Sequence, residues 1–249
     1  MEGSNEKKFL TGAILIGVLL SSCASTIPVK RVTTQLNLET PQVEEQPKTK
    51  KIIGIVSPSQ YFKEYYEDKL KKALQTAIQE ILIKKGFTLK GPYETFDDIT
   101  YQDKKKIYLT LIPEINLDIK KVVEENKCNN LYCSEKGKLY FGGDVTVTLI
   151  EPLTRQVFMK KRINLSDANI VDPYTYQYQI NNRNKDLITD LVSKATAPKE
   201  LIDSRDKAMA EGINRFYKYA VSKLNKYLDR EELLSFEKDV EQVKHLKRF

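Results

Sequence analysis

Cys23 is the residue whose sequence neighbours most clearly specify a reaction. It directly follows Leu20-Ser21-Ser22, and a cysteine after such a triplet is the lipobox at which bacterial signal peptidase II cuts. The apolar run at residues 9–20 and the lysines before it are typical of a secretory signal. At about 12 residues the run is too short to span a bilayer, which needs about 20. We therefore expect residues 1–22 to be a signal peptide and Cys23 to be the lipidated N-terminus.

Acylation would hold the mature chain at a membrane. One acyl chain anchors only marginally, whereas two or three, palmitate among them, hold stably. Ala24 follows the cysteine, and Asp at that position would favour retention at the inner membrane. We therefore expect an outer-membrane lipoprotein at the cell surface, with the periplasmic face as the other location. The alternative is an ordinary secretory signal in which Cys23 is incidental.

Cys128 and Cys133 are the other residues that could react, in this case with each other. An exported chain meets an oxidising compartment, so we expect a local disulfide between them. A structural metal site would need about four ligands. The single histidine, His245, lies in the C-terminal tail. We therefore expect neither a metal ion nor another cofactor.

Lysine and arginine side chains on both sides of the cysteines form a candidate ligand-binding surface. The net charge is +7. Export argues against nucleic acid as a partner, so the basic excess favours lipid headgroups, lipopolysaccharide or sialylated glycans. The alternative is scattered solvating charge, because Glu124, Glu125 and Glu135 dilute the cluster. The residues predicted for an anion site are Lys120, Lys121, Lys127, Lys136, Lys138, Lys160, Lys161 and Arg162.

The sequence carries no catalytic signature. It has no Gly-rich phosphate loop, no Gly-x-Ser-x-Gly and no His-Glu-x-x-His. With one histidine in the tail, histidine-based acid–base catalysis is not expected. A pair of carboxylates, as in glycosidases, stays open because sequence does not give distances. We therefore predict that the protein is not an enzyme.

The elements that must position these residues follow an N-terminal tether. Residues 23–50 have three prolines and no glycine, which is tether composition, and alternation predicts an edge strand over residues 31–38. Residues 51–56 are predicted to form a strand. Ser57-Pro58 is then expected to begin a long helix, whose apolar stripe of aromatic and aliphatic residues ends at Gly86.

The middle of the chain is predicted to form strands. Period-two alternation indicates strands over residues 107–119 and 139–149, separated by a polar loop over residues 120–138 that contains both cysteines. Residues 151–155 predict a hairpin turn, and residues 157–165 continue on the partner strand.

The C-terminal part is predicted to be mainly helical. Tyr174, Tyr176 and Tyr178 alternate; such a stripe can bind sugars but more often packs as an edge. A short helix is predicted over residues 186–194. Ser204 and Asp229 are expected to cap two further helices with apolar stripes.

The order of elements predicts one α+β domain over residues 51–249. In this fold class, long amphipathic helices would pack on one face of a mainly antiparallel sheet.

Several segments, taken in order, carry a resemblance to a known family. They are Val147-Thr148-Leu149-Ile150-Glu151-Pro152, Asn164-Leu165-Ser166, Gln60-Tyr61 before the long helix, Gly86-Phe87 after it, and the lipobox. In this order they resemble the neuraminyllactose-binding haemagglutinin family of bacterial surface lipoproteins, over nearly the whole mature chain. The resemblance implies an outer-membrane or flagellar-sheath adhesin for glycans that bear sialic acid.

One segment departs from the family's pattern. The family's proposed sialyllactose segment reads Lys-Arg-Thr-Ile-Gln-Lys-Lys, whereas residues 120–127 here include Glu124 and Glu125. These carboxylates would repel a sialate, which favours a bidentate Arg. We therefore expect a paralogue of the founding adhesin, lipid-anchored and haemagglutinin-like. The alternative is an envelope structural or assembly lipoprotein that binds protein or lipopolysaccharide without binding glycans.

Overall fold

The computed structural model describes residues 26–60, 66–180 and 197–246. The predicted helix over residues 186–194, the lipidation residue Cys23 and the signal segment lie outside these ranges. The strands are β1 (Val29–Arg31), β2 (Ile52–Val56), β3 (Ser59–Gln60), β4 (Thr88–Tyr93), β5 (Leu109–Cys128), β6 (Tyr132–Ile150), β7 (Val157–Asn164), β8 (Ile170–Gln179) and β9 (Leu201–Asp203). The helices are α1 (Glu67–Lys84), α2 (Tyr101–Lys106), α4 (Arg205–Tyr227), α5 (Arg230–Ser235) and α6 (Glu237–Leu246), with 3-10 turns η1 (Phe96–Asp98) and η2 (Leu165–Ala168).

The strands form one mixed sheet in the order β1-β9-β8-β6-β5-β2-β4, with β3 beside β5 and β7 beside β6. The prediction of a mainly antiparallel sheet is therefore wrong, although the class is broadly α+β. Strand β2 runs parallel to both β4 and β5, and β1 runs parallel to β9. The physical reason lies in the connections, because α1 returns the chain from β2 to the start of β4 and a helical crossover makes neighbouring strands parallel.

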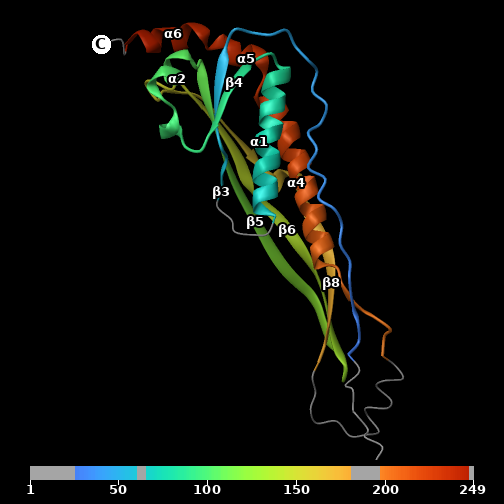
Figure 1. Cartoon of the computed structure of the whole chain (residues 1–249). Coiled ribbons are helices and arrows are strands. Elements are labelled where there is room, and N and C mark those ends of the chain that lie inside the picture. The colour runs from blue at the N-terminus through green and yellow to red at the C-terminus, as the bar shows by residue number, and fades with distance from the viewer. Residues whose placement is uncertain (1–25, 61–65, 181–196, 247–249) are drawn as a thin grey trace, which may run out of the picture.

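Helices α1 and α4 lie side by side on one face of the sheet (Figure 1). The stripe on α1 that the sequence predicted, Leu70, Leu74, Ile78 and Ile81, is fully buried against the strands and α4. Gly212 lets α4 approach β6 closely, since a Cβ there would lie 2.0 Å from Cζ of Phe141. Close packing of these apolar faces supplies most of the stabilisation, at roughly 1.5–3 kcal/mol for each fully buried aliphatic side chain.

The longest feature of the molecule is the hairpin of β5 and β6. Their pairing runs from Thr110 opposite Ile150 to Cys128 opposite Cys133. The predicted loop over residues 120–138 is therefore wrong, because both strands continue to a tight turn at residues 129–131. The sequence hid these strands because their outer halves carry polar residues on both faces, so no apolar alternation appears. We call residues 116–128 and 132–144 the ribbon, which extends below the helices in Figure 1.

Two helix boundaries differ from the sequence prediction. Helix α1 begins at Glu67 after Tyr66, and Ser57-Pro58 leads instead into β3, which pairs with β5. Backbone pairing with a neighbouring strand overrides a local N-cap signal at that point. Gly86, with φ of +87°, does end the helix as predicted.

Caps and breaks shape the C-terminal helices. Asp229 accepts from the backbone N–H of Glu232, which confirms Asp229 as the predicted N-cap of α5. The helix that follows is broken at Phe236 into α5 and α6, where one continuous helix was expected.

The segment expected to be a tether contacts the folded domain. Strand β1 spans Val29–Arg31, so only Arg31 of the predicted edge strand over residues 31–38 is extended in the sheet. Beyond it, Leu36, Leu38 and Val43 pack against the core, and the segment follows the two long helices in Figure 1. Apolar side chains at wide spacing hold residues 32–50 in place without regular secondary structure.

Candidate functional site

A cleft of about 560 Å³ lies where the ribbon meets the start of α4. Its walls come from β5, β6, β8, α4 and the residue before α1. A second hollow of about 540 Å³ adjoins it, sharing Tyr66 and Asp206, and is lined by residues 33–36 and Leu38 of the N-terminal segment. The residues that line the cleft are Tyr66, Ile119, Lys121, Leu139, Tyr174, Arg205, Asp206 and Met209.

The ribbon supplies an apolar floor and a cation on the same face. Ile119 and Lys121 are two residues apart on β5, so their side chains point the same way, and Leu139 lies opposite Lys121 in register. Gly137 lies opposite Tyr174 of β8, and a Cβ there would lie 2.6 Å from the Tyr174 hydroxyl. A glycine at this position therefore lets the Tyr174 ring lie against the ribbon.

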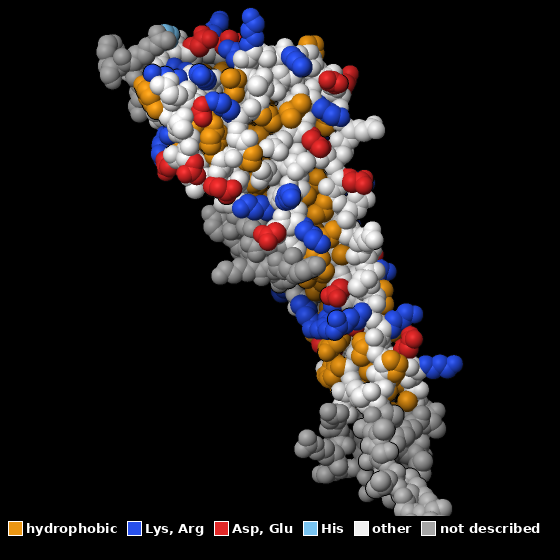
Figure 2. All heavy atoms as spheres, viewed as in Figure 1, with side chains coloured by type: hydrophobic (Ala, Val, Ile, Leu, Met, Phe, Trp, Pro, Cys, Tyr) orange, Lys and Arg blue, Asp and Glu red, His pale blue; other side chains and the backbone are white. Residues whose placement is uncertain are grey.

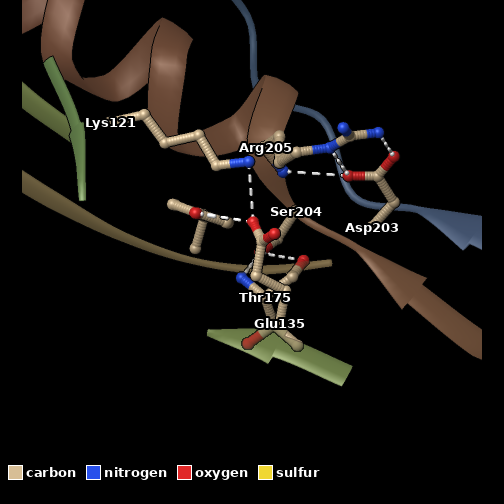
Figure 3. A network of polar contacts seen from close by, with 7 residues as sticks. Lys121, Glu135, Thr175, Asp203, Ser204 and Arg205 are labelled. Carbon is tan, nitrogen blue, oxygen red and sulfur yellow. Dashed lines mark hydrogen bonds and ion pairs between the residues drawn. The ribbon is translucent and has the colours of Figure 1, made fainter. Parts of the chain in front are cut away.

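Glu135 is the centre of the polar network beside the cleft (Figure 3). Its Oε1 accepts from Lys121 Nζ at 2.7 Å and from the Tyr174 hydroxyl at 2.7 Å. The hydrogen bond from Lys121 lowers the pKa of Glu135, and the same contact raises the pKa of Lys121. Burial, more than the bond to Glu135, raises the pKa of Tyr174. At neutral pH the network is thus an ammonium, a carboxylate and a protonated phenol.

Arg205, the first residue of α4, supplies the second cation. Its Nε and Nη2 donate to the two carboxylate oxygens of Asp203 at 2.9 and 2.8 Å. The guanidinium carbon lies 3.5 Å from the ring centroid of Tyr176. Hydrogen bonding to Arg205 lowers the pKa of Asp203. The predicted helix start at Ser204 is confirmed, but its hydroxyl bonds to the backbone of Thr175 on β8 rather than capping α4.

These pairings leave donors available for a ligand. An ammonium has three N–H groups and a guanidinium five, while Glu135 takes one from Lys121 and Asp203 takes the Nε–Nη2 edge of Arg205. The Lys121 and Arg205 side chains are 46% and 42% exposed, so both can be reached from solvent. The cleft can therefore accept an organic molecule that has an apolar face and a negatively charged or hydroxyl-rich edge.

The structure distributes the eight predicted cations over several places, and only Lys121 lines the cleft. Lys127 and Lys136 both pair with Glu125, and Lys138 pairs with Glu124 at 2.6 Å. On β7, Lys161 pairs with Glu232 of α5, and Arg162 pairs with Asp144 at 2.8 Å. Lys120 and Lys160 have no ion pair among the described residues.

The cations of β7 lie well apart from those near the end of the ribbon. Residues Lys160–Arg162 lie opposite residues 146–148 of β6, whereas Lys138 is roughly 25 Å further along that strand at about 3.3 Å per residue. The carboxylates expected to dilute the cluster, Glu124, Glu125 and Glu135, are direct partners of its cations.

Arg205, Glu135, Asp203 and Met209 were not predicted as site residues. The sequence indicates Glu135 only as a carboxylate that dilutes the basic cluster. The available signals were weak: the tyrosine alternation on β8, and Asp203-Ser204-Arg205 at a helix start. These residues come beside Lys121 only through the pairing of β5 with β6, β6 with β8 and β8 with β9, which places the start of α4 there.

A disulfide joins Cys128 and Cys133 at the end of the ribbon, with their Cα atoms 4.0 Å apart. Among the described residues, no group of three or more His, Cys, Asp or Glu side chains could hold a metal ion. Over the same parts of the chain, no helix is long and apolar enough to cross a membrane.

Comparison with known proteins identifies the family. The model of the family described as "Neuraminyllactose-binding hemagglutinin precursor" matches residues 13–247. The neuraminyllactose-binding hemagglutinin of Helicobacter pylori strain 26695 is 24% identical over 96% of this chain and 94% of its own length. Another Helicobacter pylori sequence of that name is 25% identical over the same shares.

The fold is shared with a solved structure. A crystal structure of a neuraminyllactose-binding hemagglutinin homolog from Helicobacter pylori matches 82% of this chain and 99% of its own, with a TM-score of 0.60 and 17% identity. The family model covers nearly the whole chain, and the fold agrees with it. The protein belongs to the neuraminyllactose-binding hemagglutinin family.

Proposed function

We propose that this protein is a lipid-anchored outer-membrane protein that binds an acidic glycan in the cleft. The observation that carries the proposal is the meeting of Lys121 and Arg205, from segments far apart in sequence, at one cavity of about 560 Å³. Relatives of the chain are named for binding neuraminyllactose, whose sialic acid has a carboxylate, hydroxyls and an apolar ring face.

The chemistry of the cleft suits such a ligand. The free edge of Arg205 and the remaining N–H groups of Lys121 would bind the carboxylate and hydroxyls. Ile119, Leu139 and Met209 would pack against the apolar face of the sugar. The described residues that line the cleft include no histidine and no cysteine, so binding rather than catalysis is the function proposed.

Lys120 and Lys121 offer a matched test of this site. They are neighbours on β5 and point to opposite faces, so Lys120→Ala removes the same charge from the same strand without touching the cleft. Binding of sialyllactose and of lactose to the soluble domain would be measured by titration calorimetry. We expect Lys121→Ala and Arg205→Ala to weaken sialyllactose binding by about tenfold or more, since hydrogen bonds to charged groups contribute roughly 1.5–3 kcal/mol.

Two results would contradict the proposal. One is equal loss of sialyllactose affinity in Lys120→Ala and Lys121→Ala. The other is equal binding of lactose and sialyllactose by the wild-type domain, which would mean that the acidic sugar is not recognised.

A second function is favoured by the ion pairs on the ribbon. Glu124 and Glu125 hold three of the predicted cations, so that part of the segment has little free positive charge for a sialate. An envelope structural or assembly role, with protein or lipopolysaccharide as partner, would follow if glycan arrays gave no binding above background. The anchor at Cys23 is common to both functions.

A further inference from the structure

The described chain begins at the far end of the ribbon, next to the disulfide. The backbone N–H of Ile27 donates to Oε1 of Gln179 at 3.1 Å, and Gln179 lies opposite Tyr132. The backbone N–H of Leu201 donates to the carbonyl of Pro28 at 2.8 Å, which fixes β1 beside β9. The N-terminal segment therefore enters the fold at the ribbon end, far from α5 and α6 (Figure 1).

The lipidation residue is only a short stretch of chain from this point. Cys23 precedes Ile27 by four residues, which span at most roughly 14 Å when extended. Acyl chains on Cys23 would therefore hold the ribbon end close to the headgroups. The opposite end of the molecule lies more than about 40 Å away, since the ribbon alone rises about 3.3 Å per residue.

The surface at this end has the chemistry of a membrane interface. Val29, Tyr178 and Ile202 are 50%, 37% and 41% exposed, although each is a large apolar or aromatic side chain. Tyrosines prefer the boundary between headgroups and acyl chains, and lysines reach past apolar surface to the phosphates. We call this the tip surface, which comprises residues 26–31, 125–136, 177–180 and 197–202.

Cations outnumber carboxylates on the tip surface. Figure 2 shows lysine and arginine side chains beside apolar ones at the lower end of the described part of the molecule. Glu125 pairs with Lys127 and Lys136, and Glu200 pairs with Lys30, while Glu135 turns toward Lys121 in the cleft. The tip surface therefore keeps a net positive charge although several of its lysines have a carboxylate partner. The cations are Lys30, Arg31, Lys127, Lys136 and Lys199, and the carboxylates are Glu125, Glu135 and Glu200.

We propose that the tip surface docks on the anionic headgroups of the membrane that holds the acyl chains of Cys23, so that the protein stands on its ribbon. The inference rests on the lipid anchor of the proposed function. Lys121 in the cleft would then lie roughly 20–25 Å from the end of the ribbon, since Cys128 is seven residues further along β5. Helices α5 and α6 would be farthest from the membrane.

The chain contains no tryptophan, so a single introduced tryptophan reports its own surroundings. Tyr178→Trp places one on the tip surface, and Tyr101→Trp, at a side chain 60% exposed on α2, is the matched control at the other end. Acylated protein would be bound to vesicles of phosphatidylcholine and phosphatidylglycerol that contain lipids brominated near the glycerol. We expect several-fold stronger quenching of Tyr178→Trp than of Tyr101→Trp.

The charge of the tip surface is tested in the same assay. Lys127→Glu with Lys136→Glu should reduce quenching of Tyr178→Trp, because the reversed charges repel anionic headgroups. Lys106→Glu with Lys238→Glu, at exposed positions on α2 and α6, should leave it unchanged.

Flotation with the vesicles separates failure of the anchor from failure of the docking. Protein that floats while both tryptophans are equally quenched, or while neither is, would overturn the docking and leave the anchor intact. If Cys23 proves not to be acylated, an N-terminal polyhistidine tag on nickel-chelating lipid restores the tether, and absent quenching of Tyr178→Trp there would again overturn it. If Tyr178→Trp is shielded from an aqueous quencher in whole envelopes but not on the vesicles, the partner of the tip surface is a protein, and the docking on headgroups is overturned as well.

Discussion

Nζ of Lys121 lies 2.7 Å from Oε1 of Glu135, and the same oxygen accepts a hydrogen bond from the hydroxyl of Tyr174. The three residues come from β5, β6 and β8, so the network ties three strands together below the cleft. The carboxylate holds the ammonium in place before a ligand arrives, which reduces the entropy lost on binding. The same carboxylate lowers the net positive charge of the site, so the cleft favours ligands that combine an anion with hydroxyls.

The pH dependence of stability tests this network. The pKa of Glu135 lies below its ordinary value of 4.5, so its stabilising contribution is present above that value and is lost as pH falls through the lowered pKa. The raised pKa of Lys121 keeps the pair charged beyond 10.5, so the contribution is constant across the neutral range. We expect Glu135→Gln to lower the free energy of unfolding by roughly 1 kcal/mol at pH 7, with the difference shrinking below about pH 4.5.

Urea unfolding at several pH values measures this effect. Glu200→Gln is the control, because Glu200 is 54% exposed and pairs with Lys30 only at 3.8 Å. A Glu135→Gln variant as stable as wild type at pH 7 would mean that the network does not stabilise the fold.

Lipidation at Cys23 is tested by Cys23→Ala. Signal peptidase II requires the cysteine at the cut, so the variant should accumulate as an uncleaved or misprocessed precursor without acyl chains. Mass spectrometry of the mature N-terminus checks this. Wild-type protein cut elsewhere, with Cys23 unmodified, would refute the prediction.

The disulfide should matter locally rather than globally. Cys128 and Cys133 close a short ring at the end of the ribbon, away from the core, so Cys128→Ser with Cys133→Ser should cost at most about 2 kcal/mol. Hydrogen exchange at residues 129–132 should become faster while the melting temperature changes little. Protein from the envelope should show no alkylatable thiol at these positions, and two free thiols in unreduced native material would contradict the prediction.

Close packing of α4 on β6 should make Gly212 intolerant of a side chain. A Cβ there would lie 2.0 Å from the Phe141 ring, so Gly212→Ala should destabilise by about 1–3 kcal/mol although alanine favours helices. Gly142→Ala is the control, because its nearest atoms would be 3.9 Å away. Equal melting temperatures for the two variants would show that α4 can shift without cost.

Ligand binding in the cleft should depend on salt. Lys121 and Arg205 are both partly exposed, and exposed charges are screened over roughly 8–10 Å at physiological salt. Sialyllactose affinity should fall as sodium chloride is raised, and Lys121→Ala should flatten this dependence. A sialyllactose affinity that does not change with sodium chloride concentration would mean that the ligand binds away from these cations.

The sequence alone determined the features that depend on neighbouring residues. The apolar stripe of α1 is buried, Gly86 ends that helix and Asp229 caps α5, because propensity and capping act within a few residues. The class of the fold and its family resemblance followed from the order of such elements. The signal segment and Cys23 stay predictions of the same local kind, because they lie outside the described residues.

Tertiary structure decided the pairing of strands and the site. No local pattern shows that residues 120–138 belong to two long strands. Backbone pairing among β5, β6 and β8, rather than burial of one apolar face, holds these polar residues in an extended conformation. Parallel pairing of β2 with β4 and β5 depends on how α1 returns the chain. Lys121, Glu135 and Arg205 meet only after β5, β6, β8 and α4 have packed together, so the cleft is a property of the assembled sheet.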